Sequence, residues 1–191
     1  MNRRRSTRKQ RLDEGLAAAD PSFAVEDDEP MTPERMTTLA KNMVLRKLTR
    51  APQTRQQLAD YLLERGITDD IVEQVLGRMA DVGLVNDAEY AAMFVRSKRA
   101  SRGLAPRVLA QELRQRGVDA EIIETELSAI SPSDDRELAL SLVTKKLASM
   151  ARFDKETRTR RLTSMLVRKG FGPGLAFDVV REALGATDSD A

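Results

Sequence analysis

The sequence predicts an all-α protein in which three tandem three-helix repeats form an elongated, curved array. Three observations predict this fold: a segment that recurs around a glycine, apolar side chains at helical spacing, and residues that commonly start or end helices. No stretch of the chain alternates apolar and polar residues with enrichment in β-branched types, so we expect no β-sheet.

The recurring segment is aligned on Gly66, Gly117 and Gly170, which are 51 and 53 residues apart. Leucines stand eight and four residues before each glycine, and this spacing places both side chains on one helical face. Glycine ends a helix readily because the left-handed conformation after the last turn costs little without a Cβ. A second stripe of helical period follows each glycine. Each glycine is therefore predicted to separate two helices.

A further helix is predicted before each pair, and residues that favour helix starts mark its beginning. These starts are Thr32-Pro33, Asn86-Asp87 and Ser131-Pro132, and Thr54 with Gln57 forms a capping box at another. The three leading helices are expected at residues 34–49, 87–100 and 134–150. The complete repeats are expected at residues 32–82, 86–130 and 133–185.

The two ends of the chain differ from the repeats in composition. Residues 1–30 begin with a basic cluster, continue with acidic residues and contain few apolar side chains, so we expect a disordered tail. This basic cluster is either a binding arm or simply a solubilising tail. Residues 186–191 are expected to be frayed. No apolar run is long enough to cross a membrane and no signal peptide is evident, so we expect a cytoplasmic protein.

The composition excludes several kinds of site, because the chain has no His and no Cys. Zinc sites of the ordinary kind, thiol nucleophiles, disulfides and imidazole bases are therefore absent. The carboxylate pairs Asp69-Asp70 and Asp134-Asp135 are predicted to lie at helix starts, where the helix dipole favours negative charge. We expect no catalytic residue, metal or cofactor, and therefore no enzyme.

Charge alternates along the chain although the net charge is only +2. Basic blocks at residues 40–65, 96–116 and 144–169 carry +4, +6 and +7, and the two blocks between them are acidic. Equivalent positions align in a stacked array, so we expect a basic stripe and an acidic stripe. The stripe suits either a phosphate backbone or an acidic protein surface, whereas ordinary solvated helix faces are the simpler interpretation.

The run from Gly83 to Val118 resembles the core signature of the RecX family of bacterial recombinase regulators. The matching elements are Gly83-Leu84, Asp87, Tyr90-Ala91, Arg96, Gly103 with Pro106, and Leu113 with Gly117. Segments around Gly66 and Gly170 are similar to the first and third repeats of that family, so the resemblance covers about residues 35–185. It implies a protein that binds in the groove of the RecA filament on single-stranded DNA and inhibits filament growth, ATP hydrolysis and strand exchange.

We therefore expect a monomeric, non-enzymatic regulator whose partners are the RecA filament and, within it, single-stranded DNA. The alternative is a sequence-nonspecific DNA-binding module that acts without a recombinase. The expected contact residues of the basic stripe are Arg96, Lys98, Arg99, Arg102, Arg107, Arg114, Arg116, Arg158, Arg160, Arg161, Arg168 and Lys169. The sequence leaves open which repeat touches which recombinase surface, and whether filaments are capped or disassembled.

Overall fold

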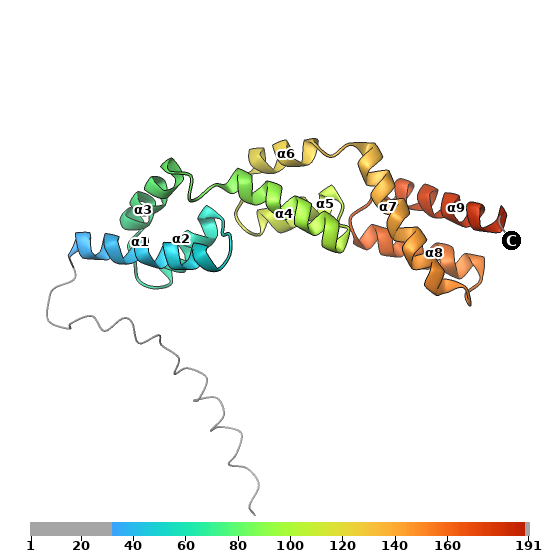
Figure 1. Cartoon of the computed structure of the whole chain (residues 1–191), viewed down its shortest axis with the longest axis horizontal. Coiled ribbons are helices and arrows are strands. Elements are labelled where there is room, and N and C mark those ends of the chain that lie inside the picture. Colours follow the sequence, from blue (N-terminus) through green and yellow to red (C-terminus); the bar gives the residue numbers. More distant parts are fainter. Residues whose placement is uncertain (1–31, 190–191) are drawn as a thin grey trace, which may run out of the picture. The chain divides into compact units, whose positions relative to one another are not determined.

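The computed structural model describes residues 32–189, so the predicted tail lies outside the described residues. Every regular element in this part of the chain is a helix, as predicted (Figure 1). The first three helices are α1 (Pro33–Arg50), α2 (Arg55–Leu63) and α3 (Asp69–Asp81). They are followed by α4 (Asp87–Arg102), α5 (Pro106–Arg114) and α6 (Ala120–Ser128). The last group is α7 (Pro132–Leu147), the 3₁₀ turn η2 (Ala148–Met150), α8 (Lys155–Arg168) and α9 (Pro173–Ser189).

Each group of three helices encloses its own apolar core, which confirms the predicted repeat. The leucines eight and four residues before each glycine are almost completely buried, and they are Leu58, Leu62, Leu109, Leu113, Leu162 and Leu166. In each group they pack with apolar side chains of the flanking helices, such as Val44 of α1, Phe94 of α4 and Val143 of α7. The helices are short, so burial of these faces stabilises them more than intrinsic propensity does.

Glycine and polar side chains end and begin the helices as the sequence predicts. Gly66, Gly117 and Gly170 have φ angles of 78°, 74° and 96°, in the left-handed region that favours glycine. The capping box of Thr54 and Gln57 is formed, with both of its reciprocal hydrogen bonds. Similar polar caps begin the leading helices α4 and α7. The glycines that adopt a positive φ and the polar caps at the helix starts therefore fix the helix boundaries.

Consecutive repeats meet through the same kind of contact at both junctions. The hydroxyl of Thr54, which is fully buried, donates a hydrogen bond of 2.6 Å to the carbonyl oxygen of Arg116. At the second junction the backbone N–H of Ala105 donates a bond of 2.9 Å to the carbonyl oxygen of Lys169. At each junction, the residue just before the middle helix of one repeat donates the bond, and the residue just before the glycine of the next repeat accepts it. The same contact therefore recurs at both junctions.

The junction glycines leave no room for a larger residue. A Cβ on Gly117 would lie 2.3 Å from the Cβ of Gln56, and one on Gly170 would lie 2.8 Å from a methyl carbon of Val108. Gly66 has the same backbone conformation, but no described atom lies within 4 Å of the position of its Cβ. At the junctions, both the positive φ and the lack of space for a Cβ therefore require glycine, whereas at Gly66 only the positive φ does.

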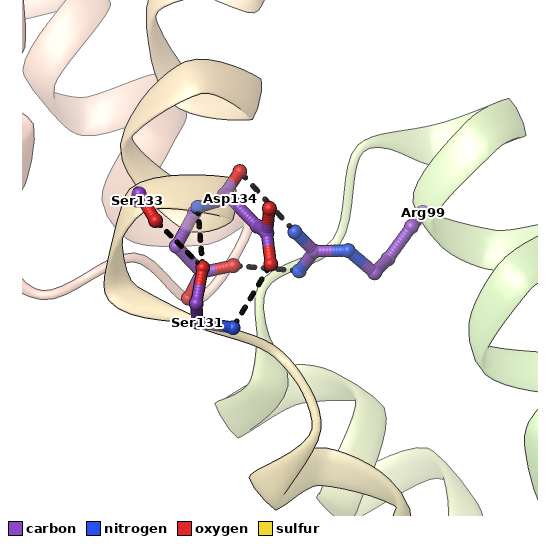
Figure 2. A network of polar contacts seen from close by, with 5 residues as sticks. Arg99, Ser131, Ser133 and Asp134 are labelled. Carbon is purple, nitrogen blue, oxygen red and sulfur yellow. Dashed lines mark hydrogen bonds and ion pairs between the residues drawn. The ribbon is translucent and has the colours of Figure 1, made fainter.

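A carboxylate at the start of the next leading helix adds a second contact at each junction. Asp87 accepts a hydrogen bond of 2.8 Å from the backbone N–H of Arg55. Asp135 forms an ion pair of 2.6 Å with Arg99. Arg99 reaches from α4 to the start of α7, where it lies beside Asp134 (Figure 2). Asp134, its neighbour, closes a capping box with Ser131. Asp135 therefore joins two repeats, whereas the sequence predicted only its place at a helix start.

In the third repeat, an arginine side chain holds the turn that precedes the middle helix α8. The guanidinium of Arg158 donates hydrogen bonds of 2.6 and 2.7 Å to the carbonyl oxygens of Phe153 and Ala151, which ties down the turn before α8. Pro173 begins α9, so Gly174 is helical and the link between α8 and α9 ends at Gly172. Helix α9 extends to Ser189, into the segment for which we predicted a frayed end.

Candidate functional site

Two adjoining cavities of about 530 and 610 Å³ form a basic groove in the third repeat and at its junction with the second. Both are lined by Met165 and Arg168 of α8, which makes them neighbours. No Asp or Glu lines either cavity. The basic groove is defined by its cationic lining residues, which are Arg99, Arg102, Lys145, Lys146, Arg152, Arg160, Arg161, Arg168 and Lys169.

Helix α8 contributes three of these nine cations, Arg160, Arg161 and Arg168. Arg161 and Arg168 are seven residues apart, or about two helical turns, and therefore lie on the same face. Arg160 and Arg168 are exposed and form no ion pair with a described carboxylate. The cause is local: Leu162 and Leu166 turn the opposite face of α8 into the core, so the arginines are directed outward.

The smaller cavity, of about 530 Å³, is lined by one aromatic ring, Phe153, which contacts two guanidinium groups. The guanidinium carbons of Arg152 and Arg161 lie 4.9 and 4.1 Å from the centre of the Phe153 ring. Such contacts orient the side chains without neutralising them, because the ring attracts a cation through its quadrupole. Arg158 holds the backbone of the same turn in place. The arginines around this cavity are therefore partly ordered in advance of any ligand.

The cations at the junction end of the groove are engaged within the protein. Arg99 pairs with Asp135, and the side chains of both are less than one fifth exposed. Arg102 lies 2.9 Å from Glu112, and the ammonium of Lys169 donates a hydrogen bond to the carbonyl oxygen of Arg102. These groups fix the junction, so less of their charge is available to a partner.

The remaining members of the predicted stripe lie away from the groove. Arg96 lines a different cavity, of about 320 Å³, together with Tyr90. Lys98 and Arg116 lie over the ring of Phe94, at 5.4 and 4.5 Å from its centre. The last two, Arg107 and Arg114, are exposed and line none of the cavities described here. The structure thus brings together only part of the predicted set.

Three residues of the groove were absent from the predicted contact set: Lys145, Lys146 and Arg152. All three belong to the most basic block of the sequence, residues 144–169, so the charge count contained the signal. The sequence did not show that the C-terminal end of α7 and the turn after it face the same cavities as α8.

Two carboxyl groups near the groove have lowered pKa values. Hydrogen bonds from Ser131, first from its side chain and then from its backbone, hold the pKa of Asp134 below its ordinary value of 3.8. The backbone and hydroxyl of Thr157 lower the pKa of Asp154 in the same way. Asp154 is the N-cap of α8, and Asp134 is the third residue of α7, which completes the capping box with the N-cap Ser131. Within residues 32–189, no group of three or more acidic side chains is placed to hold a metal ion.

The chain matches three family models in the order of its repeats. They describe the first, second and third three-helix domains of RecX and match residues 40–79, 86–127 and 134–180. The chain belongs to the RecX family. RecX proteins are regulatory proteins, which agrees with the expectation that this chain is not an enzyme. No helix in the described residues is long and apolar enough to cross a membrane.

Two relatives named regulatory protein RecX illustrate the similarity. The protein of Thermobifida fusca is 46% identical over 81% of this chain and 83% of its own length. That of Streptomyces lividans is 42% identical over 90% of both chains. The crystal structure of RecX from Lactobacillus salivarius superimposes with a TM-score of 0.71 at 22% identity, over 78% of this chain and 96% of that one. This last likeness supports the RecX fold of three-helix repeats.

Proposed function

We propose that the chain is a negative modulator of the RecA recombinase that binds in the groove of the RecA–single-stranded DNA filament. In that position it inhibits filament growth, ATP hydrolysis and strand exchange. The observation that carries the proposal is the basic groove: nine cations around two adjoining cavities with no acidic side chain in the lining. Membership of a family of regulatory proteins supports it.

The groove suits occupation of a surface rather than chemistry. Its cations can attract phosphate or carboxylate groups, and several such contacts made at once multiply weak affinities through effective concentration. A nucleoprotein filament offers both kinds of anionic group in a periodic arrangement. The acidic side chains of α3 and α6 lie outside the groove and would oppose tight binding to bare DNA alone.

Inhibition of RecA ATP hydrolysis on single-stranded DNA tests the proposal. The rate is measured while the chain is titrated, once with RecA added before the chain and once after it. We expect hydrolysis to fall in both orders, because a groove-bound regulator reaches filaments that are already formed. Unchanged hydrolysis over the whole titration would refute the function.

The same groove also fits the alternative, a sequence-nonspecific DNA-binding module that needs no recombinase. The two functions differ in their response to RecA. A filament-directed regulator binds RecA-coated DNA more tightly than bare DNA at equal salt, whereas a plain DNA-binding module binds bare DNA at least as tightly. A binding titration with labelled DNA, with and without RecA, separates them.

A further inference from the structure

A cavity of about 320 Å³ beside α4, here called the α4 cavity, shares no lining residue with the basic groove. Its apolar lining consists of Leu48, Pro52, Leu84, Tyr90 and Met93. Leu84 is 51% exposed, and Val82, two residues before it, is 69% exposed. Apolar side chains that gather on the surface of a soluble protein mark interaction sites more often than isolated ones do. The turn between α3 and α4 therefore carries an apolar surface that no described residue covers.

Two opposite charges flank this apolar lining. Glu89 and Arg96 both border the α4 cavity, and both are exposed. They are seven residues apart, or about two helical turns, so they lie on one face of α4 with Met93 between them. Neither forms an ion pair with a described residue. The face therefore presents an unpaired acid towards one end and an unpaired base towards the other.

This order of charges is complementary to itself. If two copies of α4 pack antiparallel around a two-fold axis near Met93, Glu89 of each copy lies opposite Arg96 of the other. A two-fold interface makes each contact twice, so all four charges gain a partner. Ala100, about one turn beyond Arg96 on the same face, is exposed and small, so it does not hold the partner helix away. The face of α4 is thus suited to a second copy of itself.

We propose that the α4 cavity and the exposed face of α4 form the interface of a homodimer. The second copy of α4 covers the apolar wall around Leu84 and supplies a counter-charge to Glu89. A nucleic acid is a poorer occupant, because its phosphates would be repelled by the Glu89 carboxylate. This inference replaces the monomer that we expected from the sequence. It is independent of the proposed function, because self-association can be measured without RecA.

Sedimentation equilibrium of the full chain at low salt tests the dimer. The protein concentration is raised from about 1 to 200 µM, because an interface built mainly on one helix is expected to be weak. We expect the mean mass to rise from that of one chain towards that of two, and to level off there because a two-fold interface is closed. A chain that stays monomeric over the whole range would overturn the inference.

Charge reversal on α4 tests how the copies pair. E89R leaves two bases on the face and R96E leaves two acids, so each variant alone should dimerise on the order of tenfold more weakly than the wild type. A mixture of the two variants restores both pairs of opposite charges, and we expect a mixed dimer of nearly wild-type affinity. The double variant E89R/R96E should dimerise as well. It carries both changes, so its recovery would exclude misfolding as the cause of the single-variant losses.

Matched controls separate the interface from general surface effects. R114E and E124R reverse exposed charges on α5 and α6 that line none of the cavities described here, so we expect less than about a twofold change. L84S removes apolar surface from the cavity wall and should weaken dimerisation on the order of fivefold. V82S removes a more exposed apolar side chain that does not line the cavity, and its effect should be smaller. Circular dichroism checks that all variants remain folded.

Three further outcomes would overturn the inference or separate it from the proposed function. A mixture of E89R and R96E that stays monomeric would show that these charges do not meet across an interface. If the wild-type chain is monomeric and L84S loses inhibition of RecA, the cavity receives the recombinase instead of a second copy. If the chain dimerises as expected and does not inhibit RecA, the proposed function fails and the dimer stands.

Discussion

The second and third repeats are both rich in basic residues but use them differently. In the second repeat Arg99, Arg102 and Arg116 have carboxylate partners at 2.6, 2.9 and 3.6 Å. In the third repeat Arg160 and Arg168 have no such partner among the described residues and border cavities that no acidic side chain lines. Arginines of the basic block in the second repeat are thus paired with carboxylates inside the protein, whereas Arg160 and Arg168 of the third repeat remain available for binding.

The difference follows from where each repeat lies in the array. The second repeat has a neighbour on both sides, so Arg99 meets the start of the next repeat's leading helix, where Asp135 is positioned to pair with it. The third repeat has no following neighbour in the described residues, and its α8 arginines face open cavities. The neighbouring repeat supplies the carboxylate that neutralises Arg99, and no neighbouring repeat within residues 32–189 supplies one to Arg160 or Arg168.

Substitution of the two junction glycines, Gly117 and Gly170, should show the largest effect on stability. We expect G117A and G170A to lower the free energy of unfolding by about 2–5 kcal/mol, because a positive φ and a steric overlap add at each position. The matched control G66A has the positive φ without the overlap and should cost about 1–2 kcal/mol. Urea denaturation measures all three. Equal losses would show that the junctions relax freely.

The ion pair that joins the two repeats should show the next largest effect. R99A leaves Asp135, which is only 19% exposed, without its partner, and we expect a loss of about 1–3 kcal/mol in unfolding free energy. R102A removes a guanidinium that is 53% exposed and should cost less than about 1 kcal/mol. A double-mutant cycle with D135A isolates the pair. A coupling energy near zero would contradict a structural role for Arg99.

The contrast between the repeats should also be visible in regulation. We expect R160Q/R168Q to raise the concentration needed for half-maximal inhibition of RecA ATP hydrolysis on the order of tenfold, which is about 1.4 kcal/mol. R107Q/R114Q removes two exposed arginines of the second repeat that lie outside the groove, so we expect less than about a twofold change. A reversed order would assign the contact to the second repeat.

The smallest effect concerns acid stability at the start of α7. Because the folded-state pKa of Asp134 is lowered, its contribution to stability is present above pH 3.8 and is lost as the pH falls through the folded pKa. S131A removes the main cause, so the carboxyl should titrate closer to 3.8 in carboxyl NMR spectra. S133A, which leaves the hydrogen bonds to Asp134 in place, serves as the control. An unchanged titration in S131A would contradict the assigned cause.

The helices and their ends could be predicted from the sequence because local physics determines them. The leucines before each glycine, the capping residues such as Thr54, and the positive φ of Gly117 all depend on residues a few positions apart. These relations survive in any context where the helices form.

The composition of the groove could not be predicted in the same way. Arg116 and Arg160 both stand in strongly basic blocks, yet Arg116 lies over Phe94 while Arg160 borders a cavity. The difference depends on contacts between helices that are far apart in sequence. Arg152 was overlooked because its position follows from a turn that Arg158 holds in place. Charge counts locate basic segments, but packing decides which charges remain accessible.

The bond from Ala105 to Lys169 uses only main-chain atoms, and the glycine beside it needs only the absence of a side chain. Such a joint places little demand on the identity of its neighbours, so whole repeats can be exchanged as units. A chain with an extra copy of residues 86–130 after the second repeat would supply the main-chain donor, the main-chain acceptor and the glycine of this bond at each new joint. Duplication within a gene could therefore lengthen this protein before any new side chain had been selected.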